Sequence, residues 1–157
     1  MGSRPAPDRI AAWRALLQVH ADVTEAVDRA LAEAGAIPLR WYDALLCLYE
    51  APGRRLRLGE LARAALLSRS GLSRLVDRLE GAGLLRRAPS AEDGRGAVAV
   101  LTPAGLTALR RAWAVYGPAL ERHFAGHLRA ADVAALQAAF ARVTVARERA
   151  RGVPQEP

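Results

Sequence analysis

LGELARAALLSRSGLSRLVDRLEGAGLLRRAPSAEDGRGAVAVLTPAG, residues Leu58 to Gly105, is the stretch that decides the fold of this chain. Its apolar residues first recur at helical spacing, in two runs that are separated by the serine-containing segment 68–70. Glycines then end the second run, and two short apolar runs that suit β-strands follow on either side of a polar link. Two short helices followed by a hairpin indicate a winged helix-turn-helix.

The two helices differ in how clearly they begin. The first has an apolar stripe made of Leu58, Leu61, Ala62, Ala65 and Leu66, and only Gly59 is available as its cap. The second begins at Ser68-Arg69-Ser70, where the two hydroxyls suit unpaired backbone N–H groups at a helix N-terminus. Its inward face is predicted from spacing i, i+3, i+4 and i+7 and comprises Leu72, Leu75, Val76 and Leu79.

The opposite face of this second helix is polar and lies at its N-terminal half. It presents short hydroxyl donors and guanidinium groups around one carboxylate: Ser70, Ser73, Arg74, Asp77 and Arg78. Such side chains are the ones that reach phosphates and guanine edges in the major groove of DNA. Because polarity, spacing and a following wing occur together, we expect DNA binding rather than an ordinary solvated face.

The predicted wing follows two glycines, Gly81 and Gly83, that suit the end of a helix. Residues 84–87 and 96–101 are its strand-like runs, and Arg95 lies near the tip of the link between them. A guanidinium at that place suits the negative potential of a narrow minor groove. Thr102-Pro103 then predicts an N-cap and the first residue of a new helix.

Working outward, apolar residues at helical spacing predict a long helix over about 8–34 that Gly35 ends. Pro38 then suits the first turn of a second helix over 39–50. Residues 54–58 alternate charge and leucine and suit a short strand. The helix after Pro103 is expected to kink or break at Gly117-Pro118. A last helix over about 131–149 carries a narrow apolar seam, which is typical of dimerisation: Val133, Leu136, Phe140 and Val143.

The sequence therefore predicts a mainly α protein with a small β-wing, a winged helix-turn-helix flanked by dimerisation helices. The helical dimerisation region is expected to comprise residues 8–36 and 103–150, and the winged helix-turn-helix DNA-binding region residues 37–102. Residues 1–7 and 151–157 are expected to be flexible tails.

Composition limits the classes of partner. The chain has 157 residues, 52% of them hydrophobic, which suits one domain with an extension. Its net charge of +7 favours nucleic acid first and an anionic membrane surface second, although all 23 basic residues are arginines, which also suits a GC-rich coding sequence. With no apolar run near the roughly 18 residues of a membrane span, and no signal-peptide core, we expect a cytoplasmic protein without a membrane partner.

Three further features have two interpretations each. Cys47 stands between leucines and suits a small buried hydrophobe better than a redox-sensing thiol. His123 and His127 stand at i, i+4, but two histidines without a convincing third ligand make a weak metal site, so no metal and no cofactor is expected. Large aromatic residues suit either a small-molecule pocket at a junction of lobes or the core of that junction, and the residues concerned are Trp13, His20, Trp41 and Tyr42.

With these residues in view, the chain resembles the MarR (multiple-antibiotic-resistance regulator) family of bacterial transcription factors. The resemblance is strongest in LSRSGLSRLVDRLEGAGLLRR, in the acidic-acidic-Gly-Arg-Gly of residues 92–96 and in LTPAG at 101–105, and it extends more loosely over nearly the whole chain. Gly59 stands where many members have Ser or Thr, and Arg129 where a serine cap is frequent. These departures bear only on local helix boundaries.

The resemblance implies a homodimer whose terminal helices interlock and whose two subunits each place a helix in a major groove and a wing in the adjacent minor groove. It assigns DNA contact to Ser68, Arg69, Ser70, Ser73, Arg74 and Arg78, with Arg95 as the wing arginine, Asp93 as the acidic residue that supports it, and an effector site between the dimer helices and the DNA-binding lobe. Arg86 is expected to follow the DNA backbone.

We therefore expect a dimeric, sequence-specific DNA-binding regulator, a repressor that a small-molecule ligand releases from an inverted-repeat operator. The alternatives are a redox-responsive regulator that uses Cys47 and a winged-helix module for protein contact. An enzyme is not expected, because the serines of 68–73 have no histidine nearby in sequence and there is no Gly-rich phosphate loop.

Overall fold

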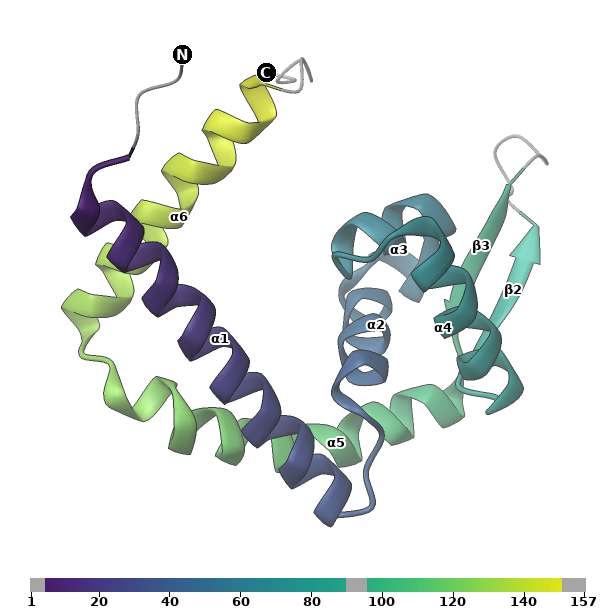
Figure 1. Ribbon diagram of the computed structural model, residues 1–157. Helices are drawn as coiled ribbons and strands as arrows, with labels where there is room; N and C mark the ends of the chain where they lie inside the picture. Colours follow the sequence, from purple (N-terminus) through teal and green to yellow (C-terminus); the bar gives the residue numbers. More distant parts are fainter. Residues whose placement is uncertain (1–4, 90–95, 151–157) are drawn as a thin grey trace. The chain divides into compact units, whose positions relative to one another are not determined.

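The computed structural model describes residues 5–89 and 96–150. Its helices are α1 (Pro7–Glu33), α2 (Leu39–Glu50), α3 (Leu58–Ala64), α4 (Arg69–Gly81), α5 (Pro103–His123) and α6 (Ala130–Ala150), with short 3-10 turns at Pro52–Arg54 and Ala125–His127. Its strands are β1 (Arg55–Arg57), β2 (Leu85–Pro89) and β3 (Ala97–Leu101) (Figure 1). This largely helical chain with a small antiparallel sheet confirms the predicted fold class.

Two compact units make up the chain, and the boundary in sequence falls between Leu120 and Glu121. The first unit contains α1 to α4, the sheet and most of α5. The second contains the end of α5 and α6. None of the helices within residues 5–89 and 96–150 is both long enough and apolar enough to cross a membrane.

The sheet has the strand order β1-β3-β2, and both pairings are antiparallel. Leu56, Ala99 and Arg87 form one row across it, and Arg55, Val100 and Arg86 form the next. Because successive residues of a strand point to opposite faces, these two rows lie on opposite faces of the sheet. Ala99 is fully buried, so the row with Arg87 faces the helices and the row with Arg86 faces outward.

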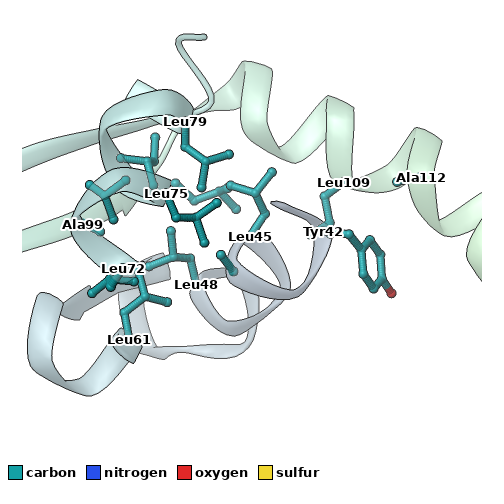
Figure 2. Packing of buried hydrophobic residues seen from close by; sticks show 14 of the residues in the cluster. Tyr42, Leu45, Leu48, Leu61, Leu72, Leu75, Leu79, Ala99, Leu109 and Ala112 are labelled. Atoms are coloured by element: carbon teal, nitrogen blue, oxygen red, sulfur yellow. The ribbon is translucent and has the colours of Figure 1, made fainter. Parts of the chain in front are cut away.

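The core of the first unit is almost entirely aliphatic and joins α2, α3, α4, the sheet and α5 (Figure 2). Leu45 and Leu48 of α2 are fully buried, as are Leu61 of α3, Leu79 of α4 and Ala99 of β3. The helices contact one another and the sheet in this order, since α2 contacts α3 and β3, α3 contacts α4, and α4 contacts β2. The core thus fixes α4 against the wing strands.

Most predicted ends of elements agree with the structure, and two local predictions need correction. Gly59 is not the cap of α3, because Arg57 is the N-cap residue and its backbone N–H donates to the Glu60 carboxylate at 3.0 Å. The helix α5 is not broken at Gly117-Pro118, since it continues through Pro118 to His123. Of the two expected outcomes, a kink or a break, the break is therefore wrong, although proline removes one helical hydrogen bond there.

Two other helix starts show the expected chemistry. At α5, the Thr102 hydroxyl accepts the Gly105 N–H at 3.0 Å and donates to the Gly83 carbonyl at 2.7 Å, which ties the start of α5 to the turn after α4. At α6, the Asp132 carboxylate accepts the Arg129 N–H at 3.0 Å, which is the hydrogen bond that the acidic side chain of a capping box makes, while Arg129 stands in the place of the serine. Residues 151–157, and residues 1–4 of the expected N-terminal tail, lie outside the described residues.

Candidate nucleic-acid interface

Helix α4 begins within the serine-containing segment 68–70 that the sequence indicated, and of its two serines Ser68 is the N-cap. The Gly71 backbone N–H donates to Ser68 Oγ at 3.1 Å, and the hydroxyls of Ser68 and Ser70 lie 3.4 Å apart. The predicted apolar face is buried, since Leu72, Leu75, Val76 and Leu79 are each at most 3% exposed. With four anchors in the core, α4 has a fixed rotation about its own axis, and its other face points to solvent.

That other face is where the predicted contact residues lie. Ser70, Ser73, Arg74, Asp77 and Arg78 are all exposed. Neither Arg74 nor Arg78 forms an ion pair with any residue of the described ranges. Ser68 is exposed as well, and Arg69 is the first residue of α4. Two free guanidinium groups beside short hydroxyl donors form a surface that suits a polyanion.

The wing brings in fewer of the predicted residues. Arg86 is exposed on the outer face of β2 and is well placed to reach solvent or a phosphate. Asp93 and Arg95 lie in residues 90–95, outside the described residues.

Arg87, the neighbour of Arg86, was not singled out by the sequence reading. Its side chain pairs with two carboxylates of α4, through Nη2 with Asp77 and through Nη1 with Glu80. Its backbone N–H also donates to Glu80 Oε1 at 2.7 Å. These hydrogen bonds from Arg87 hold the pKa of Glu80 below its usual range. The first wing strand is therefore bonded directly to the candidate recognition helix.

A signal for Arg87 was present in the sequence. Leu85 is buried and stands two residues before Arg87, so strand alternation puts Arg87 on the inner face and Arg86 on the outer. Because two arginines stand side by side in the sequence, they suggest a single basic patch, although their side chains lie on opposite faces of the sheet.

The turn between α3 and α4 has a conformation that the sequence did not predict. Leu66 has a φ of +55° and is 92% exposed. A left-handed backbone costs a residue with a Cβ about 1 kcal/mol, and an exposed leucine gains nothing in return from the core. This turn allows α3 and α4 to cross within a few residues, since Leu67 N–H donates to the Ala62 carbonyl at 2.8 Å on its far side.

The proposed pocket residues are divided between different surroundings. Tyr42 is fully buried, Trp41 is partly buried, and Trp13 and His20 are exposed on α1. The ring of Tyr42 stacks on Tyr116 with centroids 4.5 Å apart, and on Trp113 at 6.4 Å, whereas no ring contact within the described ranges joins it to Trp13 or Trp41. Trp113 and Tyr116 of α5 were missed as partners, although both lie on a helix with clear apolar spacing.

Tyr42 also carries an unpaired group. Its hydroxyl is buried and has no hydrogen-bond partner among the described residues, and burial raises the pKa of the phenol. In Figure 2 this oxygen points away from the labelled leucines. A buried hydroxyl without a partner is costly, and it supplies one polar group that a small polar ligand or a water molecule would satisfy.

A separate hollow of about 920 Å³ is lined by α3, α4 and the start of β3. Ser73 borders this hollow, together with Leu58, Leu72 and Ala97. None of the four proposed pocket residues lines it. No group of three or more potential metal ligands occurs within the described ranges, and the ring of His127 bonds instead to the Arg122 carbonyl through Nε2, at 2.9 Å.

Known proteins resemble this chain over nearly its whole length. AbsC, a MarR family transcriptional regulator from Streptomyces coelicolor, is 32% identical, with a TM-score of 0.83 over 96% of this chain and 99% of its own. Sco3205, a MarR family transcriptional regulator from the same organism solved in complex with DNA, is 30% identical, with a TM-score of 0.82 over 92% of this chain and 90% of its own.

A mutant MarR from E. coli complexed with operator DNA shares the fold at 23% identity, with a TM-score of 0.75 over 90% of this chain and 99% of its own. The sequence profile of the MarR family matches residues 37–96, which begin just before α2 and end just before β3. A comparison with curated proteins found no match.

Proposed function

This chain belongs to the MarR family of transcriptional regulators, and from that premise we propose that it is a homodimer that binds an inverted-repeat operator in double-stranded DNA. The family consists of DNA-binding regulators and not of enzymes. The observation that carries the proposal is the exposed face of α4, where Arg74 and Arg78 are free of ion pairs within the described ranges while four apolar side chains hold the helix in the core.

Each α4 would enter a major groove. Ser68, Arg69, Ser70 and Ser73 would contact the phosphates and bases near the helix N-terminus, where the backbone dipole also favours an anion. Arg74 and Arg78 would read base edges, since a guanidinium bonds guanine through two parallel hydrogen bonds. Arg86 would contact the DNA backbone. Arg95, supported by Asp93, would enter the minor groove at the wing tip.

Dimerisation would come from the regions predicted for it, residues 8–36 and 103–150. Apolar side chains left exposed on α1 support this proposal, because Trp13 is 58% exposed, Leu17 48% and Leu16 40%. Within the second unit, Val143 of α6 is 58% exposed and Phe140 44%. Two half-sites one helical turn apart, roughly 34 Å, require the dimer to hold its two α4 helices at that spacing.

Repression released by a ligand follows from the same geometry. A ligand that binds better to a dimer with another spacing would shift the population away from the DNA-bound form. The residues around Tyr42, together with Trp13, His20 and Trp41, are the site we propose for it, and the unpaired Tyr42 hydroxyl supports a polar ligand group there. As a regulator of DNA without a membrane partner, the protein would act in the cytoplasm.

The experiment compares two arginines on one duplex. The DNA beside the protein's own gene is searched for an inverted repeat, and mobility shift measures binding to that repeat and to a scrambled control. We expect Arg74→Ala to cost about 2 kcal/mol on the matched duplex and to relax discrimination, because it removes a base contact. Arg86→Ala should weaken both duplexes equally and by less, because a phosphate contact carries no sequence information.

Salt provides the independent check. Binding should weaken steeply as salt rises, with a slope of about −0.9 for each phosphate contact. If Arg74→Ala and Arg86→Ala both weaken binding to the matched and the scrambled duplex by the same amount, the assignment of the α4 face is wrong. If the wild type binds every duplex no better than an unrelated basic protein does, the proposed regulator is wrong and the alternative, a winged-helix module for protein contact, is favoured.

A further inference from the structure

Asp77 is the residue on the α4 face that works against DNA binding. It is exposed and stands three residues after Arg74, the spacing at which side chains meet on a helix. A carboxylate at this place repels phosphate, and it is also able to capture the Arg74 guanidinium that the DNA contact needs. Glu80 adds a second negative charge one turn further along α4.

Arg87 meets both of these carboxylates from the wing. Asp77 is bonded by Nη2 and Glu80 by Nη1, so the two terminal nitrogens of one guanidinium are each occupied. The bond from the Arg87 backbone N–H to Glu80 at 2.7 Å fixes the strand beside the helix. The Arg87 side chain is 31% exposed and lies on the inner face of the sheet, whereas Arg74 and Arg78 are exposed and have no ion pair within the described ranges.

We propose that Arg87 is a positioning residue, which holds Asp77 and Glu80 on the wing side of α4 so that Asp77 does not pair with Arg74, which stays free for DNA. The proposal rests on the assignment of Arg74 and Arg78 under the proposed function. Arg87 contributes one positive charge against two negative ones, so it halves the local negative charge as well as directing Asp77 away from Arg74. It acts on affinity without touching DNA.

A double-mutant cycle tests this role by fluorescence anisotropy with a labelled mixed-sequence duplex that is long enough for two half-sites. Arg87→Gln in the otherwise wild-type chain should lower affinity about fivefold at low salt, since two carboxylates lose their counter-charge. In the background Asp77→Asn/Glu80→Gln, the same change should alter affinity by less than about twofold, because no carboxylate is left to be held. That background alone should bind at least as tightly as the wild type.

Two results would overturn the proposal. An equal fivefold loss from Arg87→Gln in both backgrounds would mean that Arg87 contacts DNA directly. A loss in Asp77→Asn/Glu80→Gln as large as that in Arg87→Gln would mean that the bonds only fix the wing strand. Thermal melting of each variant sets the temperature for the binding measurements below every transition, so an unstable variant is still compared while folded.

A reference variant distinguishes a failure of the proposed role of Arg87 from a failure of the proposed DNA-binding role of the α4 face. Arg74→Ala/Arg78→Ala should weaken binding to the same duplex more than Arg87→Gln does. If it has no effect, the assignment of the α4 face fails and takes the role of Arg87 with it. If it weakens binding while Arg87→Gln leaves affinity unchanged, only the role of Arg87 is wrong.

Discussion

Helices α1 and α4 are both amphipathic, but their apolar faces have different partners. The apolar face of α4 is at most 3% exposed and belongs to the core cluster of the first unit. By contrast, only Val27 and Leu31 of α1 are buried, near its C-terminal end, and Trp13 is 58% exposed. The apolar face of α4 is buried within its own chain, whereas much of the apolar face of α1 is exposed and could pack against a second chain. A pattern of apolar residues therefore predicts a buried helix face without saying which molecule buries it.

The largest effect should come from truncating the satisfied face. Leu75→Ala removes a side chain that is 3% exposed and leaves a cavity beside α3 and the sheet. We expect a loss of about 3 kcal/mol in the free energy of unfolding, measured by urea denaturation at a fixed protein concentration. Arg78→Ala on the exposed face of the same helix is the control, and it should change stability by less than about 0.5 kcal/mol. Similar losses in both variants would refute the two-faced description of α4.

Truncating an exposed apolar residue of α1 should change the stability of the fold less than Leu75→Ala does, but should clearly weaken dimerisation. Trp13→Ala should weaken self-association by about 2 kcal/mol, since exposed tryptophans at subunit interfaces carry much of the binding energy. Sedimentation velocity across a dilution series measures this, and Arg14→Ala on the same turn is the control. Affinity for a two-half-site duplex should fall with dimerisation. A wild-type chain that stays monomeric at every concentration would break the comparison, because the face of α1 would then lack the partner assigned to it.

The sequence predicted most of the first unit because its elements are specified locally. Spacing predicted the apolar face of α4, and the serines of segment 68–70 and Thr102 marked the helix starts that Ser68 and Thr102 cap. Gly105 shows what local spacing leaves out. A Cβ at this residue would lie 1.9 Å from the Leu84 carbonyl oxygen, a close approach between α5 and the turn after α4 that depends on the tertiary fold.

The candidate site was predictable to a lesser degree, for the same reason. Exposed residues of α4 follow from the position of its buried face, so Ser73 and Arg74 could be assigned from spacing alone. Strand alternation after Leu85 indicates that Arg87 turns inward, but its ion pairs could not be assigned, because Asp77 and Glu80 lie on another element. The stacking of Tyr42 on Tyr116 likewise joins two helices that are far apart in sequence.

The smallest effect should come from Cys47, which lies on α2 and packs against the core of the first unit. Burial comes first among the causes that raise the pKa of its thiol, and the charges of Asp43 and Glu50 add to it. A raised pKa leaves less thiolate near neutral pH, and the thiolate is the form that peroxide oxidises. We therefore expect hydrogen peroxide to leave DNA affinity unchanged in mobility shift, and Cys47→Ser to bind within about twofold of the wild type.

The peroxide measurement also decides whether α2 is only a packed helix of the core, as α4 is, or takes part in a switch. Release of DNA by peroxide from the wild type, but not from Cys47→Ser, would make this thiol a switch and α2 a mobile element. Unchanged affinity would favour the effector site proposed around Tyr42 over a redox switch at Cys47. Raising the pH toward the thiol pKa should speed modification by a thiol reagent, since the thiolate fraction then rises, and the unfolded chain should react faster than the folded one at any given pH.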